Sequence, residues 1–194
     1  DVVVHSTTKF INGHGTVIGG ALASRDPDFI ENGGGALVRY MGAVPSAMDC
    51  WLTSIGLKTL PLRMREHCSN ARFLAEFLES SEKVARTYWP GLESHPQHEL
   101  AARQMDDFGA MISIDLGDFE SACRFMDGLS MSALAVSLGN VDTLVQHPTS
   151  MTHRLMSEED RQAVGITQGM IRISVGIEAI EDIIADFEGA LSRV

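Results

Sequence analysis

A lysine follows closely on an apolar run near the start of the sequence. Val2, Val3 and Val4 are three β-branched residues in a row, which is typical of a buried β-strand. The sequence then changes to His-Ser-Thr-Thr-Lys, which ends at Lys9. A lysine that leaves a buried strand is poorly hydrated, and desolvation favours the neutral amine. A neutral amine can form a Schiff base with an aldehyde, so Lys9 is a candidate catalytic residue.

The hydroxyl groups beside Lys9 indicate which aldehyde this could be. In an extended chain Ser6 and Thr8 face the same side, because side chains alternate along a strand. Short hydroxyls near an amine suit a phosphate-bearing carbonyl compound such as pyridoxal 5'-phosphate (PLP). Taken alone, the pattern also fits a strand that simply runs out into a solvated loop, which is the commoner case.

A second candidate, Arg172, interrupts an apolar stretch near the other end of the chain. The stretch 170–176 alternates in hydropathy and predicts a strand. An unpaired charge in such a strand is costly, so the guanidinium needs a partner. That partner is either a protein carboxylate or the carboxylate of a substrate, which a guanidinium can hold by two parallel hydrogen bonds. The spacing alone leaves both open.

The elements that would position these residues divide near Pro61. Before it, the patterns predict strands at 2–4 and 16–24, a helix start at Asp26 weakened by the glycines at 33–35, and a helix at 46–60. After it, they predict helices at 62–80, 99–105, 119–129, 157–165 and 180–191, and strands at 84–89, 110–116, 134–140 and 170–176. The second group is typical of a two-layer α+β domain. We therefore expect two domains, 1–60 and 61–194.

Composition argues against several classes of partner. The 194 residues carry a formal net charge of -11, which disfavours nucleic acid and anionic membranes. The sequence shows no signal-peptide pattern and no apolar run of membrane-spanning length, so we expect neither in these residues. Three widely spaced cysteines indicate a reducing compartment, so we expect a cytoplasmic protein. His95 and His98 flank a proline and lack further ligands nearby, so no metal site is predicted.

The chain opens inside a predicted strand, without a methionine, a cap or a preceding helix. An independent domain rarely begins in this way. We therefore expect the sequence to be a fragment of a longer polypeptide, or one piece of a cleaved one.

Residues 1–15, Asp-Val-Val-Val-His-Ser-Thr-Thr-Lys-Phe-Ile-Asn-Gly-His-Gly, closely resemble the cofactor-lysine motif of the PLP-dependent Cys/Met metabolism family. That family includes methionine γ-lyase, cystathionine γ-lyase, cystathionine γ-synthase and the acyl-homoserine sulfhydrylases. The resemblance implies an α/β protein of the aspartate-aminotransferase-like class (fold type I). It also implies that Lys9 carries PLP as a Schiff base and moves protons, and that Ser6 and Thr8 hold the cofactor phosphate.

Three later stretches, 137–139, 147–153 and 169–178, look like the C-terminal motifs of the same family, in the same order. By this match Arg172 binds the α-carboxylate of a small amino-acid substrate and Ser137 assists. Residues 1–60 would be the end of the PLP-binding large domain, and 61–194 the small C-terminal domain. The rest of the cofactor site would come from the N-terminal half of the same enzyme and from neighbouring subunits, in a homotetramer built from dimers.

Val136 bears on the substrate that the resemblance implies. Family members that handle cystathionine commonly carry a glutamate just before Ser-Leu-Gly, whereas the position is valine here, as in methionine γ-lyases. This favours α,γ-elimination on methionine or homocysteine. Residues 43–46 and 49–50 look as much like the cystathionine enzymes, and 38–40 and 54–56 depart from the family pattern. The alternatives are cystathionine γ-lyase, γ-synthase or acyl-homoserine sulfhydrylase activity, or, in another class, an inactive fragment or a structural subunit.

Overall fold

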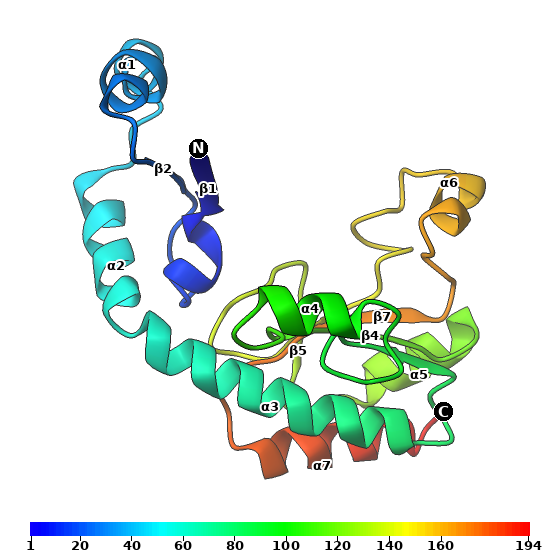
Figure 1. Ribbon diagram of the computed structural model, residues 1–194. Helices are drawn as coiled ribbons and strands as arrows, with labels where there is room; N and C mark the ends of the chain where they lie inside the picture. The colour runs from blue at the N-terminus through cyan, green and yellow to red at the C-terminus, as the bar shows by residue number, and fades with distance from the viewer. The chain divides into compact units, whose positions relative to one another are not determined.

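The computed structural model describes residues 1–194, which divide into two units, Asp1–Pro61 and Leu62–Val194. The first unit consists of β1 (Val2–Ser6), the π-helical turn η1 (Thr7–Ile11), β2 (Gly20–Ser24), a second π-helical turn η2 (Phe29–Gly33), α1 (Gly34–Met41) and α2 (Ala47–Lys58). Helix α3 (Leu60–Ser80) begins at the end of this unit and lies almost entirely in the second (Figure 1).

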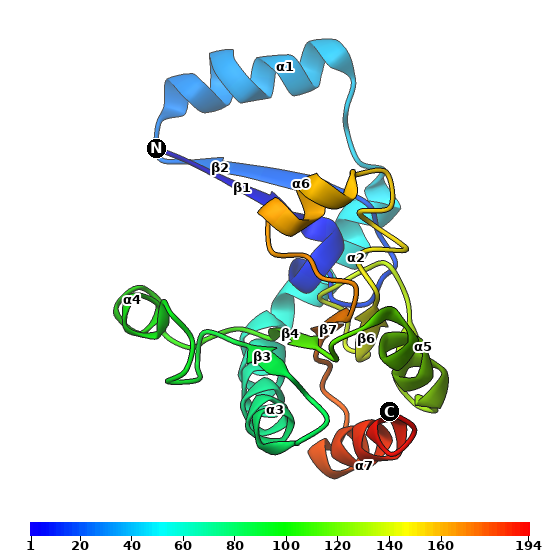
Figure 2. The same ribbon diagram turned by 90° about the vertical axis from the view of Figure 1, so that its right-hand side faces the viewer.

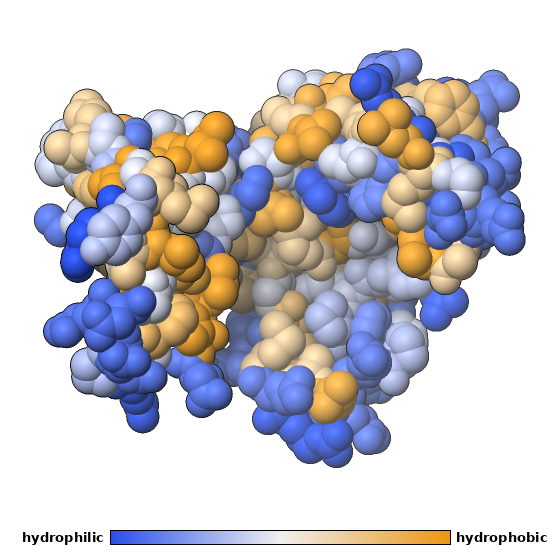
Figure 3. Space-filling view, turned by 90° about the horizontal axis from the view of Figure 1, so that it is seen from above, coloured by the Kyte–Doolittle hydropathy of each residue, from blue (hydrophilic) through white to orange (hydrophobic).

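Strands β1 and β2 form an antiparallel hairpin, with Val2 opposite Ser24 and Ser6 opposite Gly20. The sequence predicts a buried strand at 2–4, and the structure corrects this: Val3 is 53% and Val4 71% exposed. Within residues 1–194 the hairpin has only two strands and no second layer, so its apolar side chains are uncovered in this chain. Figure 3 shows hydrophobic surface gathered over this unit.

Helix α1 begins within the glycine triplet at 33–35, where the sequence predicts a weakened helix. The glycines are explained by a close approach of the backbone, because a Cβ at Gly35 would lie 1.8 Å from the carbonyl oxygen of Ile30. The wide turn η2 therefore leaves no room for a side chain there. Helix α1 ends at Gly42, whose φ of +75° suits glycine.

The second unit contains, after α3, the elements β3 (Arg86–Tyr88), α4 (His98–Gln104), β4 (Met111–Asp115), α5 (Phe119–Gly128), β5 (Ala133–Leu134), β6 (Leu144–Gln146), α6 (Glu158–Ala163), β7 (Met170–Ser174) and α7 (Ile180–Leu191). Its sheet has the order β3-β4-β7-β6-β5, and every neighbouring pair is antiparallel except β5 and β6. No helix combines the length and the apolar character that crossing a lipid bilayer requires.

Helices α3, α5 and α7 lie on one side of this sheet (Figure 2). The strands contribute fully buried side chains that pair across the sheet: Ile112, Ile114, Val145, Ile171 and Ile173. From the helices, Phe125 and Phe187 meet edge to face with ring centroids 5.5 Å apart. Because side chains alternate along a strand, Arg172 lies on the face of β7 opposite to this core.

The sequence predicts a strand that runs into a turn over 134–140, and the structure has the turn but a shorter strand. Strand β5 covers only Ala133–Leu134, and the chain has turned by Gly139, whose φ is +78°. On the side of β7 away from β4 lies β6, which was not predicted from the sequence. All residues of β6 are buried, so this short strand shows no alternation that a pattern could reveal.

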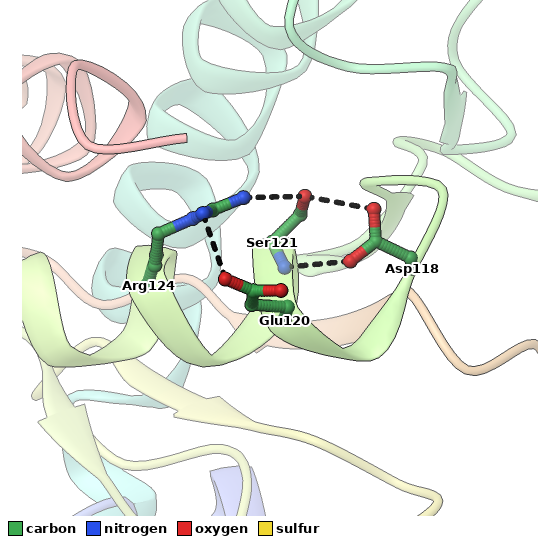
Figure 4. A network of polar contacts seen from close by, with 4 residues as sticks. All are labelled: Asp118, Glu120, Ser121 and Arg124. Atoms are coloured by element: carbon green, nitrogen blue, oxygen red, sulfur yellow. Dashed lines mark hydrogen bonds and ion pairs between the residues drawn. The ribbon is translucent and has the colours of Figure 1, made fainter.

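The start of α5 follows its sequence signal. Asp118 caps the helix by accepting hydrogen bonds from the Ser121 backbone N–H at 2.9 Å and from its hydroxyl at 3.0 Å (Figure 4). These hydrogen bonds hold the pKa of the Asp118 carboxyl below its usual value. One turn on, Arg124 forms an exposed ion pair with Glu120 at 3.0 Å.

Candidate active site

Lys9 lies half-buried in the turn η1, directly after β1. The turn is closed by backbone hydrogen bonds from Asn12 N–H to Thr7 O at 3.1 Å and from Gly13 N–H to Lys9 O at 2.8 Å. Lys9 itself has φ −94° and ψ −136°, so the helical turn is kinked at this residue. The strand that leads to Lys9 is exposed in residues 1–194, whereas the sequence predicts a buried strand there.

The hydroxyls of Ser6 and Thr8 have different surroundings. Ser6 is exposed at the end of β1 and makes no capping hydrogen bond. Thr8 accepts a hydrogen bond from Gly19 N–H at 2.9 Å and donates a longer one to Gly19 O at 3.3 Å. Thr8 already lies in the turn η1, so strand alternation does not determine which way these hydroxyls face.

Asn12 holds the loop that follows Lys9. Its side chain is 1% exposed, and its Oδ1 accepts hydrogen bonds from the backbone N–H of His14 at 3.2 Å and of Thr16 at 3.3 Å, and from the Thr16 hydroxyl at 3.1 Å. On its other side the Asn12 backbone packs on α2 at Gly56, where a Cβ would meet the Asn12 carbonyl oxygen at 2.2 Å. Asn12 was not predicted as a site residue, because its partners become neighbours only in the folded loop.

Arg172 stands in β7 in the second unit, half-buried. Its Nη2 donates to the carbonyl oxygen of Ser137 at 2.9 Å, and its Nε is buried without a hydrogen-bond partner. Burial lowers the pKa of the Arg172 guanidinium. The ion pairs of the chain join other residues, so the structure does not supply the protein carboxylate that was one of the two predicted partners.

Ser137 and Val136 lie beyond the end of β5, in the same unit as Arg172. Ser137 is half-buried and contacts Arg172 through its carbonyl oxygen. Val136 is 52% exposed. The segment is fixed by the bond from Ala135 N–H to Val145 O at 3.0 Å and by that from Gly139 N–H to the Ser174 hydroxyl at 2.9 Å. The structure thus brings Ser137 to Arg172, while Lys9, Ser6 and Thr8 belong to the first unit.

A carboxylate clamp joins the ends of β6 and β7. Glu178 accepts hydrogen bonds from the backbone N–H of Thr143 at 2.6 Å and from the Thr143 hydroxyl at 2.9 Å. The same hydroxyl accepts the N–H of Gly176 at 2.9 Å. The clamp fixes the register of the two strands that carry Gln146 and Arg172.

His147 directly follows β6 and is completely buried. Its ring nitrogens contact the Ser150 hydroxyl at 2.8 Å and the Gln168 carbonyl oxygen at 2.9 Å. This buried bridge was not predicted from the sequence. A histidine and hydroxyl residues within a few positions of a proline give no local signal that tells a buried bridge from a surface loop.

Comparison with known proteins places these residues in a family. The family model described as "Cys/Met metabolism PLP-dependent enzyme" matches residues 1–192. The chain is 49% identical over 197 residues to an L-methionine gamma-lyase of Fusobacterium nucleatum subsp. polymorphum, covering 100% of this chain and 49% of that protein. It is 45% identical over 193 residues to a cystathionine beta-lyase of Lactococcus lactis subsp. cremoris (strain MG1363), covering 100% and 50%.

A solved structure of cystathionine gamma synthase from Xanthomonas oryzae pv. oryzae, in complex with aminoacrylate and cysteine, superposes with a TM-score of 0.94 at 46% identity, covering 100% of this chain and 50% of that one. The fold is therefore that of fold type I PLP enzymes, as the sequence predicts. The chain belongs to the Cys/Met metabolism family of PLP-dependent enzymes. It spans about half the length of the curated relatives it matches.

The residues of the first unit fit the cofactor of this family. A lysine on a braced turn can hold an aldehyde, and the exposed Ser6 hydroxyl can donate to a phosphate oxygen. The Thr8 hydroxyl proton is engaged with Gly19 O only at 3.3 Å, a long contact for an O–H donor, so a phosphate oxygen can compete for it.

Proposed function

We propose that this chain forms part of a PLP-dependent carbon–sulfur lyase that carries out α,γ-elimination on methionine or homocysteine. The observation that carries the proposal is the state of Arg172. Its guanidinium has a buried Nε without a partner and no protein carboxylate, in a chain matched almost throughout by a family of PLP enzymes. An amino-acid carboxylate supplies the missing anion, and the family supplies the cofactor that Lys9 would hold.

In this proposal Lys9 binds the cofactor and later moves a proton. The kink at Lys9 and the hydrogen bonds of Asn12 fix the backbone from which the Lys9 side chain extends. Ser6 and Thr8 hold the phosphate. When bound, PLP supplies an electron-accepting ring that stabilises the negative charge left at Cα. The amine of Lys9, when it is not holding the cofactor, would act as the general base for the Cα proton.

Arg172 and Ser137 orient the substrate. A guanidinium holds a carboxylate through two parallel hydrogen bonds, which fixes rotation about the Cα–carboxylate axis. That rotation decides whether the Cα proton faces the base, so the guanidinium contributes to rate as well as to affinity. The bond from Arg172 Nη2 to Ser137 O holds the guanidinium from the protein side.

Val136 favours a substrate with an apolar thioether side chain over cystathionine, whose side chain ends in a second charged amino-acid group. It is apolar and 52% exposed, so it is available to an apolar side chain. The methionine γ-lyase relative named above fits this choice. The specific alternative is that the substrate is cystathionine. Two similar proteins support it: the relative named a cystathionine beta-lyase and the superposed cystathionine gamma synthase.

We also propose that the remaining cofactor contacts come from an N-terminal half and from neighbouring subunits in a homotetramer. Mass spectrometry of the purified protein tests this, since a second polypeptide with that half supports a working enzyme. Its absence, together with absence of activity, supports the interpretation as an inactive fragment.

The assay that tests the function measures 2-oxobutanoate and thiol release from methionine, homocysteine and cystathionine in the intact protein. We expect release from methionine and homocysteine to exceed that from cystathionine. Equal or greater activity on cystathionine would favour the alternative, and no keto acid from any of them would remove the lyase proposal.

A further inference from the structure

Two buried polar atoms without partners belong to directly paired residues of the sheet. Gln146 on β6 lies opposite Arg172 on β7 in the antiparallel register. Paired residues share a face, with Cβ atoms about 5 Å apart. Gln146 is 1% exposed, and its Oε1 is buried without a hydrogen-bond partner. Arg172 Nε is likewise buried and without a partner. An unpaired acceptor therefore neighbours an unpaired donor.

The orientation of the Gln146 amide does not remove this deficit. Its Nε2 donates to the Thr152 hydroxyl at 3.1 Å. Rotating the amide by half a turn lets the oxygen accept from that hydroxyl instead, and leaves the NH2 group at the other end unpaired. A buried polar group without a partner destabilises the folded protein, and one further hydrogen bond would relieve that penalty.

The accessible surface of Arg172 indicates which hydrogen bond that is. The Nε atom is closed to solvent, so a bound ligand does not reach it, and its partner has to be a protein atom. Nη2 is already held by Ser137 O. With Nε and Nη2 both held from the protein side, the guanidinium plane is fixed and its remaining N–H groups are free for a ligand.

We propose that Gln146 is a positioning residue for Arg172: its Oε1 accepts the Nε–H of Arg172 when a substrate carboxylate is bound on the outer edge of the guanidinium. A neutral amide holds the guanidinium without competing for its charge. This inference rests on the proposed function, since it takes an amino-acid carboxylate as the ligand of Arg172.

The test compares two ligands in the PLP-loaded intact protein by titration: L-norleucine, which carries the carboxylate, and pentylamine, which has the same chain without it. In Gln146→Met, which replaces the amide by an apolar chain of similar length, the Kd of norleucine is expected to rise about 5- to 10-fold, the value of one typical intramolecular hydrogen bond. The Kd of pentylamine is expected to stay within about twofold.

Gln104→Met, an exposed substitution at the end of α4, is the matched control and should change neither ligand. Gln146→Asn provides a second variant that keeps the amide but shortens its reach, and it should weaken norleucine selectively as well. Equal weakening of both ligands would show a merely structural role and overturn the proposal, as would unchanged norleucine binding. If the unmodified protein itself fails to prefer norleucine over pentylamine, the carboxylate role of Arg172 in the proposed function falls instead.

Discussion

The backbone of Gly56 in α2 packs against the carbonyl of Asn12, so closely that a Cβ at Gly56 would lie 2.2 Å from the Asn12 oxygen and 2.8 Å from its carbon. Asn12 closes the turn that carries Lys9. The contact therefore fixes the candidate catalytic lysine through one backbone approach that only glycine permits.

Gly56→Ala is expected to lower the stability of the protein by roughly 1–3 kcal/mol, because backbone atoms must move to admit the methyl group. Because the displaced atoms belong to the Lys9 turn, cofactor occupancy should fall as well. Thermal unfolding and PLP absorbance measure the two effects. Gly189→Ala is the matched control: nothing lies within 4 Å of its Cβ position in α7, so it should stabilise the helix by about 0.5–1 kcal/mol. Equal behaviour of the two variants would contradict the close approach.

Arg172→Lys keeps the charge but removes the planar pair of donors. We expect kcat/KM to fall roughly 10- to 100-fold, the value of a lost charge-assisted hydrogen bond or two. Steady-state kinetics on methionine measures this. Arg124→Lys, in the exposed ion pair drawn in Figure 4, should leave the kinetics unchanged. Unaltered kinetics in Arg172→Lys would mean that Arg172 does not bind a substrate carboxylate through two parallel hydrogen bonds.

Val136→Glu places a charge on a half-exposed apolar position beside Ser137. If the position faces the thioether, the ratio of kcat/KM for methionine to that for cystathionine should fall by about tenfold, because an apolar contact is lost and a second ammonium group gains a partner. Val164→Glu, exposed beyond α6, serves as the control. A ratio that does not move would remove Val136 from the substrate site.

Asp186 in α7 makes the second unit sensitive to acid. Burial alone would raise its pKa, but hydrogen bonds from the backbone N–H groups of Ser130, Ser132 and Met131 outweigh burial and lower it to about 2. The ionised carboxyl thus stabilises the folded state above the unfolded value of 3.8, and this contribution is lost as the pH falls from there toward 2. Its full size is about 2 kcal/mol.

Chemical unfolding as a function of pH checks this expectation. Asp186→Asn should be less stable than the unmodified protein at neutral pH, and the difference should shrink as the pH falls between 4 and 2. Glu188→Gln, exposed on the same helix, removes a charge without these hydrogen bonds and should not change the profile. A difference that is constant across this pH range would contradict the assigned hydrogen bonds.

Sequence patterns predicted the elements that have clear periodicity or caps. Strand β7 shows alternation, α7 an apolar stripe and α5 the Asp118 cap, and all three lie where expected. Strand β6 was missed because its few residues are all buried. The exposure of β1 was mispredicted because hydropathy alone does not show whether a second layer is present.

The sequence predicts the charged residues of the candidate site, but not the residues that hold them in position. Lys9 and Arg172 stand out because each is a charge next to apolar residues. Gln146 lies opposite Arg172 only through the strand register, and Gly56 meets Asn12 only through helix packing. Such relationships join residues distant in sequence and leave no local pattern.

The central claim is that Lys9 holds the cofactor, and borohydride trapping tests it most directly. The intact protein is loaded with PLP, reduced with borohydride, digested and analysed by mass spectrometry. The account predicts a phosphopyridoxyl group on the peptide that contains Lys9, its loss in Lys9→Ala, and its retention in Lys58→Arg and Lys83→Arg, which replace the other two lysines of the chain. A phosphopyridoxyl label on Lys58 or Lys83 would contradict this claim. So would an unlabelled Lys9 in the unmodified protein, together with PLP absorbance that persists in the Lys9→Ala variant.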